Sequence, residues 1–439
     1  MQLTAVRPFW AHRLPRLDQS LAVLLLIVAA VALVYFGADM RPAVAFLPLP
    51  AAVVVAAIRK APHVAAAALP LISIGVDGLL VYFDRQTPVR ISTVVLAVLL
   101  WTHLSSRSRF HLPALPLAAW LAALLLTNYA LVALPTGTAI DSKLLALIVE
   151  GLVVSMAVAS IRPNPQLVLG AVALSGLIAA YFTFFPEFDI GGRPFGLGLD
   201  PNYFGTILAV GITATATLAR VRNSVLWLAL IAPMVGGLLQ VQGRSSVLAA
   251  AAGLLGVLSL SKDRLRGLLI LFSAGCFIAS GYLFGVRPGF GAFTNRRIDT
   301  VESSKIREEI NAVSVNAVKS APATGVGLGV VEQLAKENPD LGVVVSHNEY
   351  LRFAASAGIP ALGGLLLILL VPVAAGATSA RRRSSAAVLW PSLASCLVAL
   401  AFLNVLDNAQ LATLIMTLAG AAWASLDLHH RGSGSEQQV

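Results

Sequence analysis

A short polar segment late in the chain carries side chains that could take up a proton. SHNEYLR, residues 346–352, places His347 and Asn348 beside Glu349 in a chain that is 57% hydrophobic. A neutral imidazole accepts a proton near neutral pH, so His347 is a candidate general base. Because most loop histidines simply contact water, this interpretation depends on where His347 lies and on what surrounds it.

The same segment has the pattern of a helix start. Ser346 and Glu349 have the spacing of a capping box, in which Glu349 returns a hydrogen bond to the backbone N–H of Ser346. His347 would then lie in the first helical turn, where free N–H groups and the helix dipole favour a nearby anion. The same field disfavours an imidazolium and keeps His347 able to accept a proton. Gly358, before Ile359-Pro360, predicts the end of this helix.

Three arginines occur near other expected helix starts. Arg193 precedes Asp200, a candidate N-cap that is followed by Pro201 at the first helical position. Arg244 directly precedes an apolar run, and Arg307 belongs to an amphipathic segment. Arginine suits phosphate because its planar fork makes two charge-assisted hydrogen bonds and stays charged. Each could equally be an ordinary interfacial arginine, so the side of the membrane that they face matters.

The composition indicates a membrane protein. The chain has 439 residues with a mean hydropathy of +0.82, and only 12% are charged, whereas soluble domains carry nearer a quarter. Apolar runs long enough to cross a bilayer recur from end to end, and helices are the spanning elements that satisfy their own backbone there. We predict an all-α polytopic integral membrane protein with about 12–14 transmembrane helices. The expected spans are 21–38, 42–58, 64–83, 91–104, 112–134, 144–160, 166–186, 202–219, 224–240, 245–260, 267–286, 358–376, 387–405 and 409–425.

The basic residues orient these spans. Although the net charge is +10, they form short clusters between apolar runs, as membrane orientation requires and nucleic-acid binding does not. One side, taken as cytoplasmic together with both termini, receives Arg7, Arg13, Arg16, Arg59, Lys60, Arg107, Arg109, Arg162, Arg220, Arg222, Lys262, Arg264, Arg266, Arg381, Arg382, Arg383 and Arg431. His347 is then the one histidine expected outside. Arg193, Arg244 and Arg307 also face outside, where the charge bias makes arginine less expected.

The polar segments divide the chain into four parts. Residues 1–187 are expected to form N-terminal transmembrane helices, and 188–286 form further transmembrane helices whose outer ends carry the arginine motifs. Residues 287–347 form a long periplasmic loop, and 348–439 form the C-terminal transmembrane helices and a cytoplasmic tail. Cys276 and Cys396 lie in apolar segments, which indicates neither a disulfide nor a metal site.

Within the long loop, residues 301–319 have the periodicity of an amphipathic helix. Ile306, Ile310, Val313 and Ala317 recur at helical spacing. The run GVGLG at 325–329 follows no predicted strand, so we interpret it as a turn and not as a dinucleotide fingerprint.

Two acids fall inside predicted spans. Asp77 and Glu150 are functional candidates because ionisable residues in a membrane are costly. No basic partner is evident for either, and packing or a water-filled groove explains them equally well. They are left out of the predicted site.

Four stretches in the second half resemble a known family. They are GRPFGLGLDPNYFG (192–205), QGRSSVLAA (242–250), IREEINAVSVNAVKSAPATGVGLGVV (306–331) and SHNEYLRFAASAGIPALGGLLLIL (346–369). In order, spacing and sidedness they resemble the O-antigen ligase/polymerase family of bacterial envelope glycan transferases. The resemblance covers about residues 190–376, and the first half matches only as generic spans. Members often carry Ser-Arg where this chain has Gly243-Arg244.

This resemblance implies an enzyme of the bacterial inner membrane that acts at the periplasmic face. It would move a glycan from undecaprenyl pyrophosphate to a sugar hydroxyl by an inverting reaction that needs neither a metal nor another cofactor. His347 would take the proton from the acceptor hydroxyl. Arg193, Arg244 and Arg307 would hold the pyrophosphate, and Asn348 would orient His347 or the substrate.

The acceptor stays open at this point. We favour an O-antigen ligase of lipopolysaccharide biosynthesis, whose acceptor is the lipid A–core, and a polymerase acting on a second lipid-linked glycan is the alternative. A transporter or lipid flippase with Asp77 and Glu150 as coupling residues is a more distant alternative. It predicts inverted repeats with paired broken helices, and the sequence shows no such symmetry. A non-catalytic scaffold for envelope assembly is a further one.

Overall fold

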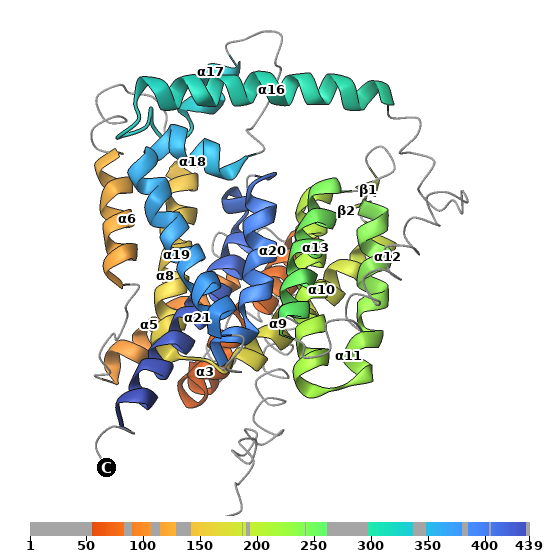
Figure 1. Cartoon of the computed structure of the whole chain (residues 1–439), viewed down its shortest axis with the longest axis vertical. Helices are drawn as coiled ribbons and strands as arrows, with labels where there is room; N and C mark the ends of the chain where they lie inside the picture. Colours follow the sequence, from red (N-terminus) through yellow and green to blue (C-terminus); the bar gives the residue numbers. More distant parts are fainter. Residues whose placement is uncertain are drawn as a thin grey trace, which may run out of the picture.

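A helical body with one long helix lying across its end makes up the protein (Figure 1). These features come from a computed structural model, which describes residues 55–82, 90–106, 115–128, 142–186, 188–189, 194–241, 243–260, 297–336, 348–379, 385–403 and 405–435. The spans expected at 21–38 and 267–286, and most of 42–58, lie outside these residues.

The first half of the described chain consists of helices and one small hairpin. In chain order these are α3 (Pro62–Leu71), the π-helical turn η3 (Ile72–Asp77), α4 (Gly78–Tyr82), α5 (Ile91–Ser105), α6 (Leu115–Asn128), α8 (Ser142–Ile161), α9 (Pro165–Phe184), β1 (Phe188–Asp189), β2 (Pro194–Phe195) and α10 (Pro201–Arg222). The all-α prediction did not include these two short antiparallel strands.

The second half begins with a helical hairpin and contains the crossing helix. It comprises α11 (Val225–Ala229), α12 (Ile231–Val241), α13 (Arg244–Ser259), α16 (Arg297–Ser320), α17 (Val330–Lys336), α18 (Glu349–Ala357), α19 (Ile359–Ser379), η6 (Ser385–Val388), α20 (Trp390–Leu400), η7 (Val405–Asp407) and α21 (Ala409–Ser435).

The expected fold class is confirmed. Among the described residues, six helices are long and apolar enough to cross a membrane, and they are Pro62–Val81, Leu144–Ile161, Pro165–Phe184, Pro201–Arg222, Ile359–Thr378 and Ala409–Leu426. Four shorter apolar helices accompany them at Ile91–Ser105, Val225–Val241, Ser245–Ser259 and Trp390–Leu400. Each coincides with a predicted span, because a hydrophobic run of that length in a membrane protein has a helix as its low-energy form.

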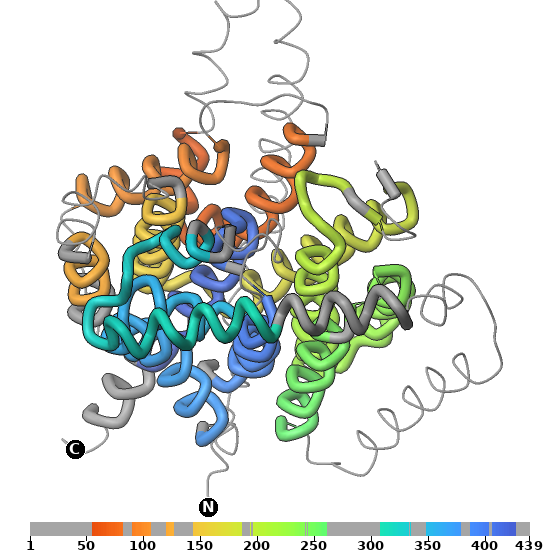
Figure 2. Tube along the Cα trace, turned by 90° about the horizontal axis from the view of Figure 1, so that it is seen from above, coloured from red at the N-terminus to blue at the C-terminus, as the bar shows by residue number. Residues whose placement is uncertain are grey.

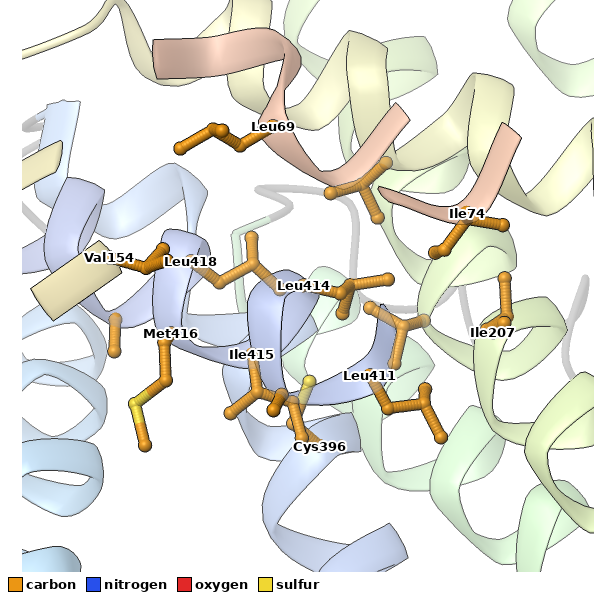
Figure 3. Close-up of a cluster of buried hydrophobic side chains, with 14 of the residues drawn as sticks. Leu69, Ile74, Val154, Ile207, Cys396, Leu411, Leu414, Ile415, Met416 and Leu418 are labelled. Carbon is orange, nitrogen blue, oxygen red and sulfur yellow. The ribbon is translucent and has the colours of Figure 1, made fainter. Parts of the chain in front are cut away.

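The core is built around α21, which packs on α8, α3, α19 and α20. Its buried side chains include Leu411, Leu414 and Leu418, which point toward neighbouring helices in Figure 3. Glycines allow the closest approach to α8: a side chain at Gly420 would overlap the backbone of Ser155. Small residues at such contacts are the usual way in which membrane helices pack, since burial from lipid gives little driving force.

The amphipathic helix predicted at 301–319 is confirmed and is longer than expected, since α16 spans Arg297–Ser320. Ile310 and Ala317 are buried, and Val313 packs against the cluster that contains Ala317. The side chain of Ile306 lies outside the described residues. The helix lies crosswise over one end of the body, above α18 and α19, and the C-terminus leaves at the opposite end (Figures 1 and 2).

The glycine run after α16 is a turn, as predicted. Gly325, Gly327 and Gly329 all have positive φ angles of +71°, +111° and +85°. Its backbone is tied to the end of α18: Val326 N–H donates to the Ala355 carbonyl at 2.8 Å and Gly327 N–H to the Ser356 carbonyl at 3.0 Å. The turn therefore docks the crossing helix onto the junction between α18 and α19.

Gly358 ends α18, also as predicted, with φ +90° and ψ 162°. Only glycine adopts this region readily, and other residues lose roughly 1–3 kcal/mol there. A side chain would also overlap the Ala323 carbonyl in the docked loop. The next residue, Ile359, donates its N–H to the Pro322 carbonyl at 2.9 Å.

Gly358→Ala should therefore destabilise the protein by at least roughly 1–3 kcal/mol, the backbone cost alone. The midpoint of thermal unfolding in detergent measures the loss. Gly363→Ala, in α19, is the matched control because nothing lies within 4 Å of the added carbon. Equal midpoints for the two variants would contradict the docking of the loop on Gly358.

Candidate functional site

The first turn of α10 is where the motif segments meet. Asp200 caps this helix by accepting hydrogen bonds from the N–H groups of Asn202 at 2.7 Å and Tyr203 at 3.1 Å, and Pro201 is the first helical residue. The predicted cap is confirmed. It follows a tight turn in which Leu197 and Gly198 are both left-handed, at φ +57° and +68°, so the chain reverses sharply before it enters α10.

The QGRSS motif begins α13 beside this turn. Arg244 is the first helical residue and Gly243 is the N-cap, with no side-chain hydrogen bond to the first N–H groups. Ser246 is fully buried against α10, where a side chain at Gly205 would overlap its hydroxyl. The start of α13 is thereby held against the first turns of α10.

The start of α18 corrects the predicted capping box. Asn348 is the N-cap, and its side chain accepts the Leu351 N–H at 3.0 Å. Glu349 is the first helical residue, and its carboxylate accepts the Leu406 N–H at 3.3 Å. The predicted register was wrong by two residues, because asparagine caps as well as serine and Glu349 is drawn into the protein.

Arg352, one turn further along α18, is the centre of a buried ion cluster. Its Nε donates to Glu332 of α17 and its Nη1 donates to Asp407 of η7, both at 2.5 Å. Glu349 lies 3.7 Å from Nη1. Arg352 is 4% exposed and Glu349 is 1% exposed. We refer to Arg352, Glu332, Glu349 and Asp407 as the Arg352 cluster.

Burial dominates the electrostatics of Glu349, and it raises the pKa of this carboxyl to about 7. Arg352 and the Leu406 N–H act in the opposite direction. The charges of Asp407 and Glu332 add to the increase. Burial works against the charge of Arg352, but its carboxylate neighbours outweigh that effect and raise its pKa further above the ordinary value.

Two residues connect the cluster to α10 and the hairpin. Tyr203, in the first turn of α10, lies within electrostatic range of Arg352, Glu349 and Asp407. Gln410, in the first turn of α21, donates its side-chain N–H to the Leu197 carbonyl at 3.2 Å. The starts of α10, α18 and α21 thus converge, with α13 packed on the same turn of α10.

The structure describes only some of the predicted site residues. His347 and Arg193 lie outside it, directly before Asn348 and β2 respectively. Arg244 and Arg307 lie in α13 and α16, but their side chains are outside the described residues. Asn348 is described, as the cap of α18. The structure brings the segments of Arg244 and Asn348 around one turn of α10 and leaves the chemical roles as predictions.

Asp77 and Glu150, for which the sequence suggested no basic partner, are both engaged. Glu150 pairs with Arg90 and accepts the Thr93 hydroxyl at 2.7 Å. Asp77 accepts the Ile91 N–H at 2.8 Å, and so caps α5. The absence of a basic partner was wrong for Glu150, because Arg90 lies sixty positions away in sequence and only helix packing brings the two together.

The sequence did not predict the ion cluster formed by Arg352, Glu332 and Asp407. Glu349 and Arg352 have the i, i+3 spacing of a helical ion pair, which was a usable signal within SHNEYLR. Nothing local marks Glu332 or Asp407. Among the residues that the structure describes, no set of three His, Cys, Asp or Glu side chains is arranged to hold a metal, since a guanidinium lies among these three carboxylates.

Comparison with known families identifies this region. Residues 228–366 match the family model described as O-antigen ligase. This stretch of the chain is similar to the O-antigen ligase family. No curated protein matches the chain. The predicted resemblance to the O-antigen ligase/polymerase family is confirmed over these residues.

The matched O-antigen ligase segment runs from α11 into α19. It includes Arg244, Arg307, His347 and most of the Arg352 cluster. Asp407 and the capped start of α10 lie outside it. The family region therefore completes its ion cluster and its packing with residues from both sides of the match.

The raised pKa of Glu349 makes a prediction for stability. Since the folded protein favours the protonated carboxyl, the stability that this group contributes is fully present below its ordinary pKa near 4.5. It is lost as the pH rises through about 7. Glu349→Gln keeps the neutral shape, so unfolding midpoints of the variant should fall less than those of the wild type across this window. Across this window, the free energy of unfolding of the wild type should fall by on the order of 1–3 kcal/mol more than that of the variant.

Glu309→Gln is the matched control, because Glu309 is exposed on α16 and its charge is in water before and after unfolding. Parallel curves of midpoint against pH for the wild type and Glu349→Gln would contradict a buried, proton-favouring Glu349.

Proposed function

We propose that the protein transfers a glycan from undecaprenyl pyrophosphate to an acceptor sugar hydroxyl at the periplasmic face of the inner membrane. The observation that carries this proposal is the convergence, within an O-antigen ligase match, of the Arg244 and Asn348 segments on the first turn of α10. A lipid pyrophosphate needs cations and N–H donors at the membrane surface, and an attacking hydroxyl needs a base nearby.

The helix starts differ in how well they suit the pyrophosphate. At α10 the first N–H groups are taken by the carboxylate of Asp200, which disfavours a second anion. At α13 the cap is Gly243, which offers no side chain to those groups. We therefore assign the pyrophosphate to the start of α13, where free N–H groups and Arg244 act together. Arg193 and Arg307 complete the cationic set.

In the proposed reaction His347 accepts the proton of the acceptor hydroxyl. The hydroxyl oxygen forms a bond to the anomeric carbon as the bond from that carbon to the pyrophosphate oxygen breaks. The electron pair leaves with undecaprenyl pyrophosphate, whose developing charge the arginines stabilise. Attack opposite the leaving group inverts the anomeric configuration, and the step needs no metal. Asn348 caps α18 and so sets the direction from which the preceding His347 enters the site.

We favour the ligase, with lipid A–core as acceptor, over the polymerase, and the family match is compatible with both acceptors. The transporter alternative relied on Asp77 and Glu150 as coupling residues. Glu150 is held by Arg90 and Thr93, and Asp77 caps α5, so both have a structural role that explains their cost within the membrane.

Purified protein incubated with undecaprenyl-pyrophosphate-linked glycan and lipid A–core tests the proposal. Glycan attached to lipid A–core is the expected product. Longer glycan on the lipid carrier would identify a polymerase instead, and transfer to neither acceptor would overturn the proposed function.

His347→Ala should lower the turnover number on the order of 10² to 10⁴-fold, the usual contribution of a general base. Donor binding should change little, because the base contacts the acceptor. His63→Ala, in the first turn of α3, is the control histidine. A folded, membrane-inserted His347→Ala protein with wild-type turnover would remove His347 from this role.

Arg193→Ala and Arg244→Ala should each weaken donor binding roughly 10- to 100-fold, since a hydrogen bond to a charged group contributes about 1.5–3 kcal/mol. Arg244→Lys should fall between, because it keeps the charge and loses the two-pronged geometry. Arg220→Ala, an exposed arginine at the far end of α10, is the control. Direct measurement of donor affinity decides: an unchanged affinity excludes that arginine from the donor site.

A further inference from the structure

The Arg352 cluster joins three segments that are far apart in sequence. Glu332 belongs to α17 of the outer loop, Glu349 to α18, and Asp407 to η7 before α21. Arg352 makes a 2.5 Å hydrogen bond to each of the first and last of these carboxylates. Such short charge-assisted bonds fix both the distance and the direction of the partners.

Stability alone is a poor explanation for this cluster. Removing ions from water is costly, and well-packed apolar side chains often stabilise a fold as well as a buried ion pair does. Here the carboxyl groups of Glu332, Glu349 and Asp407 face one guanidinium, and the charges do not balance even with Glu349 protonated. A cluster of this kind is better explained by the geometry that it imposes than by the free energy of unfolding that it adds.

The geometry that it imposes is the position of the start of α18. Arg352 lies one turn after the cap, because its backbone N–H makes the helical hydrogen bond to the Asn348 carbonyl at 2.9 Å. Its guanidinium, bonded to Glu332 and Asp407, therefore anchors the helix one turn from its cap. Glu349, the first helical residue, reaches the same η7 segment through the Leu406 N–H. Two consecutive anchors on α18 therefore hold its first turn against the chain that enters α21. His347 is the residue directly before this anchored turn.

We propose that Arg352 is a positioning residue for glycan transfer, which it serves by holding the first turn of α18, through Asp407 and Glu332, where His347 meets the acceptor. This inference rests on the proposed function. It also assigns a role to Asp407, which lies beyond the family match. A displacement of about 1 Å at a reacting group can cost about 100-fold in rate, so a cluster outside the reaction itself controls turnover.

The test separates position from stability. Asp407→Asn and Arg352→Lys should each lower turnover about 10-fold or more and leave donor affinity within about twofold. The triple variant Arg352→Met, Glu332→Gln, Asp407→Asn removes the charges while it keeps similar volumes, and it should unfold near the wild-type midpoint. Its turnover should stay about 100-fold low.

The matched control changes the ion pair between Arg90 and Glu150 in the same way. Arg90→Met with Glu150→Gln removes charges from α5 and α8, far in sequence from α18, and should leave turnover within about twofold of the wild type. A triple variant with wild-type turnover and midpoint would overturn the positioning role.

Hydrogen exchange at the amides of residues 349–353 measures the same placement without a substrate. It should be about 10-fold faster in the triple variant than in the wild type, because the first turn of α18 has lost its anchors. A wild-type protein that transfers no glycan overturns the proposed function, whereas unchanged exchange in the triple variant overturns the positioning role.

Discussion

The buried guanidinium of Arg352, which contacts three carboxyl groups, is the interaction on which the end of the molecule crossed by α16 depends. Short hydrogen bonds and an ion pair at this point join α17, the start of α18 and the turn before α21. Arginine suits this position because its planar fork satisfies two carboxylates in different directions and it stays charged when buried. A lysine would offer one charge centre and would leave the geometry of one partner open.

A second contact fixes the backbone near the Arg352 cluster. It lies between the glycine turn at 325–329 and the end of α18. Gly325 and Gly358 both lie where a side chain would overlap the opposing backbone. Hydrogen bonds from Val326, Gly327 and Ile359 close this contact. The loop is therefore attached at two places, by charge at Glu332 and by backbone at the turn. These attachments hold the crossing helix α16 over the site's end of the body (Figure 1).

Two ionic groups among the described residues show that the same residue types can have different structural roles. Arg90 and Glu150 neutralise each other between α5 and α8, which lets two helices carry polar side chains without a net buried charge. The Arg352 cluster has more carboxylates than cations and lies beside the residues with proposed chemistry. The cluster lies at the start of α18, directly after the proposed base, where the position of the helix matters for the proposed reaction.

The sequence by itself determined the class of fold, the spans, the cap at Asp200, the turn at GVGLG and the stop at Gly358, because hydropathy and backbone preferences act within a few residues. The family resemblance was likewise readable from four ordered motifs. Only the tertiary structure decided the register of the α18 cap and the partners of Glu150 and Arg352. Those pairs lie 60, 20 and 55 positions apart, and no local pattern encodes which distant charge a buried side chain will meet. The sequence also does not say whether Glu349 completes a capping box or is buried. That depends on whether tertiary packing places a guanidinium beside it.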